Sequence, residues 1–193
     1  MKRLFLVAFV ALSSATLFSS CSYNKIVGND ETVKEAWSNV EAAYQERFDL
    51  VDNLVSTVKG YAEFERGTLT EVIQARANAS GVTIKADEIT PANIEKFEQA
   101  QSALSGSLSR LLVTVEKYPD LKANANFMDL QAQLARLEQK INIARRDFNA
   151  TIKTYNTSIR SFPSVITARI FGFTEKEGFK SAAGADKAPK VKF

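Results

Sequence analysis

Apolar residues recur at steps of three and four positions along most of this chain, and this spacing constrains the fold more than any other feature. Because one face of an α-helix repeats every 3.6 residues, the pattern predicts amphipathic helices. The first predicted helix covers residues 30–79, with Asn29 or Asp30 as its N-cap. Gly60 and Gly67 are its expected bend sites, because glycine destabilises a helix by about 1 kcal/mol relative to alanine. The apolar residues along one face of this helix form its stripe, which comprises Val33, Trp37, Val40, Tyr44, Phe48, Val51, Val55, Val58, Ala62, Leu69 and Val72.

A second long helix follows a loop at residues 80–90. Thr90 is its predicted cap and Pro91 its first residue, since proline is tolerated where no helical N–H is needed. Pro119 ends it, because proline disfavours a helical residue before it. Its stripe contains one polar member and comprises Ile94, Phe97, Gln101, Leu104, Leu108, Leu111, Leu112 and Val115.

The third long helix begins near Asn126, which forms a weak capping-box pattern with Asp129. It stops before Pro163, and residues 164–173 predict a short apolar helix that docks on the others. Its stripe comprises Phe127, Leu130, Leu134, Leu137, Ile141, Phe148, Ile152, Tyr155 and Ile159.

These elements predict an all-α fold: an antiparallel up-down bundle of three long helices plus a short C-terminal helix. In this arrangement the first and third long helices are parallel. The loop from Tyr118 to Phe127 then lies at the end where the chain begins. A long coiled-coil-like rod is the alternative, because the first stripe persists for so many turns.

The first 20 residues have the composition of a secretory signal peptide. Lys2 and Arg3 form a short basic region, residues 4–12 are apolar, and small residues precede Cys21. The apolar stretch is shorter than the roughly 20 residues that a membrane-spanning helix needs.

The residues just before Cys21 resemble a bacterial lipobox. Ser19 and Ser20 fit that pattern, whereas Phe18 stands where an aliphatic residue is usual. The resemblance implies that Cys21 is the first mature residue and carries a diacylglyceryl thioether and an N-acyl chain. Several acyl chains together anchor a protein stably. The alternative is an uncleaved anchor helix in which Cys21 is an ordinary thiol, and both interpretations place the protein on a membrane.

The predicted organisation is therefore a signal peptide at 1–20, a lipidated tether at 21–29, a helical bundle at 30–180 and a disordered basic tail at 181–193. The expected location is the bacterial cell envelope, with the membrane that holds the anchor undetermined.

Composition argues against several functions. Without Lys2 and Arg3 the chain has 23 basic and 22 acidic residues, which is too balanced for a nucleic-acid-binding protein. It has no histidine and one cysteine, so the commonest general base and the usual metal-ligand sets are missing. No phosphate-binding glycine loop or serine-nucleophile turn is visible. We expect no catalysis, no cofactor and no metal.

Several stretches together resemble one family over nearly the whole mature chain. They are Tyr23-Asn24 with Ile26-Val27, residues 46–65, residues 74–76, residues 117–131, residues 141–164 and residues 170–173. This ordered set is similar to proteins of the LemA family. The chain departs from the pattern at Asp52, where the family usually has proline, and in its lipobox-like cysteine, where many relatives use a transmembrane helix.

The resemblance implies a membrane-attached helical bundle without established enzymatic activity. The expected function is interaction or scaffolding in the cell envelope, with an envelope protein of unknown identity as partner. The alternative is a membrane-organising protein whose amphipathic helices act directly on lipid.

Two groups of polar residues are candidate interaction sites. Asp49 and Asn53 lie, with Gly60 and Gly67, on the side of the first helix opposite its stripe. This line either contacts a partner or a second copy of the chain, or is a solvated back face.

On the third long helix, Arg145, Asn149 and Asn156 share one edge of the stripe. They either bind a partner or form a polar boundary that satisfies loop carbonyls. In the parallel arrangement Asp49 and Arg145 stand at similar heights, which suggests an ion pair between them.

Overall fold

A computed structural model describes residues 2–61 and 65–180, with side chains from residue 22 onward. Within these ranges the chain forms helices and no strands, so the predicted all-α fold is confirmed. The predicted tail at 181–193 lies outside the described residues. The helices are α1 (Lys2–Lys59), α2 (Arg66–Ser80), α3 (Pro91–Val115), α4 (Pro119–Lys122), α5 (Ala125–Arg160) and α6 (Ser164–Phe171).

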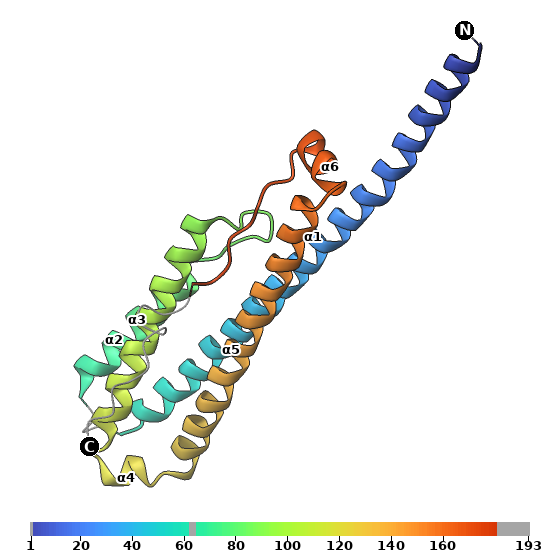
Figure 1. The fold of residues 1–193 in the computed structure, drawn as a ribbon. Helices are drawn as coiled ribbons and strands as arrows, with labels where there is room; N and C mark the ends of the chain where they lie inside the picture. Colours follow the sequence, from blue (N-terminus) through green and yellow to red (C-terminus); the bar gives the residue numbers. More distant parts are fainter. Residues whose placement is uncertain (1, 62–64, 181–193) are drawn as a thin grey trace, which may run out of the picture.

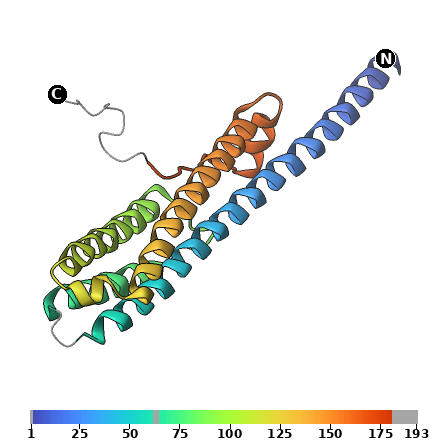
Figure 2. The same ribbon diagram turned by 90° about the horizontal axis from the view of Figure 1, so that it is seen from below.

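The long helices form two antiparallel pairs that lie side by side (Figures 1 and 2). α1 packs along α5, and α2 packs along α3. The short α6 contacts both α1 and α5, whereas the single turn α4 joins α3 to α5. The N-terminal part of α1 extends beyond the other helices (Figure 1).

The predicted helix over residues 30–79 is wrong in one respect, because the chain turns back near Gly60. α1 ends at Lys59, where the Gly60 and Tyr61 amides bond to carbonyls three residues earlier. α2 then folds back, and Arg76 reaches Asp52 with an N–O distance of 2.5 Å. Over the described residues the bundle therefore has four long helices, and α1 and α5 are antiparallel rather than parallel.

Because the chain reverses near Gly60, the loop at residues 118–127 lies at a different end of the bundle from the one predicted. It lies beside the C-terminal end of α1, where Asn124 donates a hydrogen bond of 2.9 Å to the Tyr61 hydroxyl. The expectation that this loop lies near the start of the chain is thus wrong. Asn124, rather than Asn126, caps α5 by accepting from the Phe127 amide, whereas Thr90 caps α3 as predicted.

Residues 22–29 continue α1 instead of forming a separate tether. Ile26 is fully buried, so this segment belongs to the folded body. Within the described residues, no helix combines the length and the apolar character needed to cross a membrane.

Trp37 lies where the two helix pairs meet. Its ring contacts Phe97 of α3 and Phe148 of α5, with centroid distances of 5.6 and 5.2 Å. Its Nε1–H donates to the Ile84 carbonyl at 2.9 Å, which fixes the loop between α2 and α3. One side chain thus joins α1, α3, α5 and that loop.

Replacing Trp37 with alanine is expected to lower the free energy of unfolding by about 3–5 kcal/mol, because it opens a cavity and leaves the Ile84 carbonyl unpaired. Urea denaturation followed by circular dichroism measures the change. Val113→Ala is the control, since Val113 is 70 % exposed and should shift stability by no more than about 0.5 kcal/mol. A loss near the control value would contradict the central position of Trp37.

Candidate functional site

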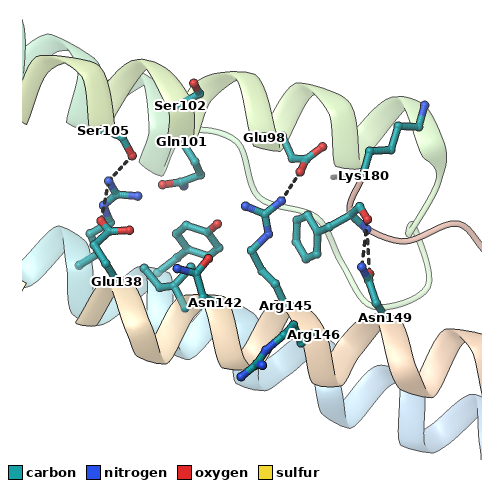
Figure 3. Close-up of a pocket in the computed structure, with 14 residues that line it drawn as sticks. Glu98, Gln101, Ser102, Ser105, Glu138, Asn142, Arg145, Arg146, Asn149 and Lys180 are labelled. Carbon is teal, nitrogen blue, oxygen red and sulfur yellow. Dashed lines mark hydrogen bonds and ion pairs between the residues drawn. The ribbon is translucent and has the colours of Figure 1, made fainter. Parts of the chain in front are cut away.

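A cleft separates α3 from α5, and α1 forms its floor (Figure 3). Its volume is about 670 Å³. Residues of the C-terminal segment close one end of it. We call residues 173–180, which follow α6, the strap. The cleft is lined by Tyr44, Arg47, Glu98, Gln101, Ser102, Ser105, Glu138, Ile141, Asn142, Arg145, Arg146, Asn149, Phe179 and Lys180.

Arg47 is a buried cation in the floor of the cleft. It is only 2 % exposed, and its guanidinium lies 3.0 Å from the Glu138 carboxylate and 2.5 Å from the Ser105 hydroxyl. Burial lowers the pKa of Arg47, and the carboxylate of Glu138 opposes that shift. Because both Glu138 and Ser105 approach the guanidinium, this charge links α1 to α3 and α5. Its Nε atom has no hydrogen-bond partner.

Gln101 is the least satisfied polar side chain of the cleft. It is 3 % exposed, and neither its Nε2 nor its Oε1 atom has a hydrogen-bond partner. Leaving a buried polar group unpaired costs about 1–3 kcal/mol. Such a group calls for an explanation, and a bound molecule with complementary donors and acceptors is one.

A second cation forms the wall next to the strap. Arg145 of α5 pairs with Glu98 of α3 across the cleft, as Figure 3 shows. Its guanidinium also lies over the ring of Phe179, 4.4 Å from the centroid. The predicted pair between Asp49 and Arg145 is therefore wrong, because antiparallel packing places Arg145 away from Asp49.

Two asparagines of α5 hold the strap by its backbone. The Asn156 side chain donates to the Lys176 carbonyl at 2.8 Å and accepts from the Lys176 amide at 2.9 Å. Asn149 makes the same pair with Phe179, at 2.9 Å for both bonds. Each carboxamide thus satisfies both polar groups of one strap residue, as a neighbouring strand would in a sheet.

The strap also completes the aromatic cluster around Trp37. Phe179 is buried, with ring centroids 6.0 Å from Trp37 and 5.6 Å from Phe148. Gly178 allows this approach, because a Cβ there would lie 2.2 Å from Asn149 Oδ1. Backbone bonds and an inserted ring together fix the strap.

The other predicted residues lie elsewhere. Asp49 and Asn53 are exposed on α1 and line a shallow groove with residues of α5 such as Lys140. Asp49 accepts a hydrogen bond of 3.0 Å from Gln45. Gly60 follows α1 and Gly67 belongs to α2, so the four residues do not form one line. Cys21 lies within α1, and its lipidation stays a prediction.

Sequence reasoning missed Arg47, Phe179 and Gly178, and it read Gln101 only as a member of an apolar stripe. A glutamine in a run of buried positions was the available signal. In the part of the chain that the structure describes, no group of three or more acidic or cysteine side chains could hold a metal ion.

The fold and cleft define an all-helical protein whose C-terminal strap is bound between two of its helices. A family model described as the LemA family matches residues 36–193. The chain therefore belongs to the LemA family.

Relatives support this assignment. The chain is 28 % identical over 183 residues to magnetosome protein MamQ 2 of Paramagnetospirillum magneticum, a match covering 85 % of this chain and 66 % of that protein. It is 27 % identical over 182 residues to MamQ of Magnetospirillum gryphiswaldense, with the same shares covered. Protein LemA of Metamycoplasma hominis is 26 % identical over 139 residues, which cover 72 % of this chain and 60 % of that protein. The chain thus spans between 60 and 66 % of the length of these relatives.

Replacing Gly178 with alanine should loosen the strap and destabilise the protein by about 1–3 kcal/mol, because the added methyl displaces Asn149. Hydrogen exchange at the Lys176 and Phe179 amides should accelerate with it. Gly28→Ala is the matched control: a Cβ meets nothing within 4 Å there, so it should stabilise α1 by about 0.5–1 kcal/mol. Unchanged exchange in the Gly178 variant would show that the strap does not depend on this close approach.

Proposed function

We propose that this LemA family protein is attached to a bacterial envelope membrane by lipid on Cys21 and binds another envelope protein through its bundle, without catalysis. The observation that carries the membrane part is an apolar patch on α6. The cleft with its unpaired glutamine supports the binding part.

The α6 patch consists of Ile166, Ile170 and Phe171 of α6 and of Phe162 just before it, four apolar side chains that are between 52 and 83 % exposed. Tyr23 contacts Phe171 with ring centroids 4.7 Å apart, so the patch lies beside α1 two residues after Cys21. Clustered apolar side chains on a surface mark a contact with a membrane or another protein. With acyl chains on Cys21, the same end of the bundle would face the lipid.

Relatives are consistent with a role other than catalysis. The names magnetosome protein MamQ and protein LemA describe no reaction. The cleft holds two cation–carboxylate pairs, Arg47 with Glu138 and Arg145 with Glu98. These charges already neutralise each other, which suits recognition better than acid–base chemistry.

A second function is a membrane-organising role in which the helices act on lipid without an anchor. The α6 patch favours it as well, because exposed isoleucine and phenylalanine insert into an interface. The first function requires lipid on Cys21, whereas the membrane-organising role does not.

Mass spectrometry of the native N-terminus is expected to find cleavage before Cys21 and acyl chains on it. The lipidated protein should then float with liposomes, whereas a chain starting at Ser22 should not, because four side chains alone bind weakly. Ile170→Ser in the lipidated protein is the control and should still float. An unmodified N-terminus that retains residues 1–20 would contradict the lipid anchor, and flotation of the unlipidated chain would favour the membrane-organising role.

Cross-linking in intact cells, followed by mass spectrometry, tests the binding part. We expect cross-links from the bundle to one reproducible envelope protein, and we expect them to disappear when the cell lacks that protein. Cross-linkers placed at Asp49 and Asn53, which line the groove between α1 and α5, show whether the partner binds that groove instead of the cleft. Recovery of the bundle without any reproducible partner would contradict the interaction role.

A further inference from the structure

We propose that the end of the bundle formed by α6 and residues 22–27 of α1 is a docking surface for the headgroups of acidic phospholipids. The α6 patch enters the bilayer interface, and the exposed cations Lys25 and Arg169 contact the lipid phosphates. This inference rests on the proposed membrane attachment. It adds which lipid is recognised and which face of the bundle turns toward the bilayer.

This surface lies where α1 leaves the bundle. Figure 1 shows α6 beside α1, at the level from which the N-terminal part of α1 extends beyond the other helices. Tyr23 of α1 contacts Phe171 and Phe173, with ring centroids 4.7 and 5.9 Å apart. An anchor at Cys21, or in the residues before it, therefore holds the α6 patch close to the bilayer.

The outer face of α6 carries apolar and basic side chains together. Thr167 and Ala168 are buried against the bundle, whereas Ile166, Arg169 and Ile170 are exposed. Residues three and four apart are neighbours on a helix, so Arg169 and Ile170 both lie beside Ile166. Isoleucine enters the boundary of the acyl chains, while the long arginine side chain reaches the headgroups. This face therefore suits a membrane interface.

The charge of this surface is positive. Residues 22–29 and 160–173 contain none of the 22 acidic residues of the chain, and they contain Lys25, Arg160 and Arg169. Arg160 pairs with Glu175 at 3.6 Å. Within the described residues, neither Lys25 nor Arg169 has an ion-pair partner. Two exposed cations are therefore available to an anion.

The acidic residues that follow these two segments do not cancel that charge. Asp30 lies 3.0 Å from Lys176 Nζ and 3.3 Å from Lys34 Nζ. Glu175 faces Arg160. Because cations already neutralise both carboxylates, the surface keeps its positive charge around an apolar centre. An acidic bilayer is complementary to both parts, since it has an anionic surface over an apolar interior.

α6 is held in this orientation before any lipid binds. Gly172 ends the helix in the left-handed conformation, with φ of 75°, and the Phe173 amide bonds to the Ala168 carbonyl at 2.9 Å. The strap that follows is fixed by Asn156. A surface that already has its bound shape loses little conformational entropy on docking.

An anchored protein needs only a weak additional contact to fix its orientation, because a tethered surface acts at a high effective concentration. Each basic residue close to an acidic bilayer favours docking about fivefold. Lys25 and Arg169 together should therefore favour the docked orientation about 25-fold over a neutral bilayer.

Tryptophan fluorescence of the full chain, purified from cells and reconstituted into vesicles, tests this orientation. Ile166→Trp places a reporter in the α6 patch. Val113→Trp is the matched control, because Val113 is 70 % exposed near the end of α3 that lies opposite α6 (Figure 1). Trp37 is the single native tryptophan and is fully buried, so it gives the same background in both variants. The vesicles contain brominated phosphatidylcholine, with or without roughly 30 % phosphatidylglycerol.

Bromine should quench the added tryptophan of the Ile166→Trp variant in the acidic vesicles and much less in the neutral ones. The Val113→Trp variant should not be quenched in either. At about 1 M salt the two kinds of vesicle should become equivalent, because the Debye length falls to about 3 Å. The measurement does not depend on which anchor the chain carries, so its failure is distinct from failure of the lipid on Cys21 or of the protein partner.

Substitution of the cations separates headgroup recognition from apolar insertion. Added to the Ile166→Trp chain, Arg169→Gln should lower the ratio of docked to undocked protein in acidic vesicles about fivefold, and Lys25→Gln should lower it by a similar factor. Arg136→Gln removes an exposed arginine in the middle of α5 and should leave the ratio unchanged.

Three results would overturn the proposal. Equal quenching of the Ile166→Trp and Val113→Trp variants in acidic vesicles would show that the α6 patch does not meet lipid and is a surface for a protein or a second copy. Equal quenching of the Ile166→Trp variant in neutral and acidic vesicles would show insertion without headgroup recognition. An unchanged ratio after both Arg169→Gln and Lys25→Gln would show that these cations do not contact the phosphates.

Discussion

The contact among Trp37, Phe97, Phe148 and Phe179 holds this molecule together. α3 and α5 face each other across a cleft, so backbone packing does not join the two helix pairs there. The four rings bridge that space with centroid distances between 5.2 and 6.4 Å. Large apolar surfaces removed from water provide the main stabilisation of such a bundle. The open part of the cleft exists because the rings fill only one end of it.

Helical periodicity predicted the elements well but not their directions. The apolar stripe of residues 30–79 is nearly the same whether the chain continues or turns back, because both halves bury the same face. Glycine at position 60 marked the place of the break, and the spacing alone could not tell a bend from a reversal. That one ambiguity inverted the relation of α1 to α5, and with it the expected proximity of Asp49 and Arg145.

The candidate residues on α5 were found from their position on the helix. The sequence could not identify which groups they contact. Arg145, Asn149 and Asn156 edge the stripe, which indicated polar contacts at a boundary. Asn149 and Asn156 bind the backbone of residues 179 and 176, in line with the alternative of a polar boundary that satisfies loop carbonyls. Arg145 instead pairs with Glu98, a partner on another helix that the pattern of α5 does not identify. Gln101 was visible as a polar member of an apolar run, but its unpaired state depends on how far apart two helices stand.

The position of Phe179 has a consequence for the order of assembly. This ring belongs to the central cluster but comes far along the chain from Trp37, so it is synthesised after α1, α3 and α5. Contacts between residues so distant in the chain form late, because long loops must close first. The earlier helices can associate during synthesis, but their shared interior stays incomplete until Phe179 has been added.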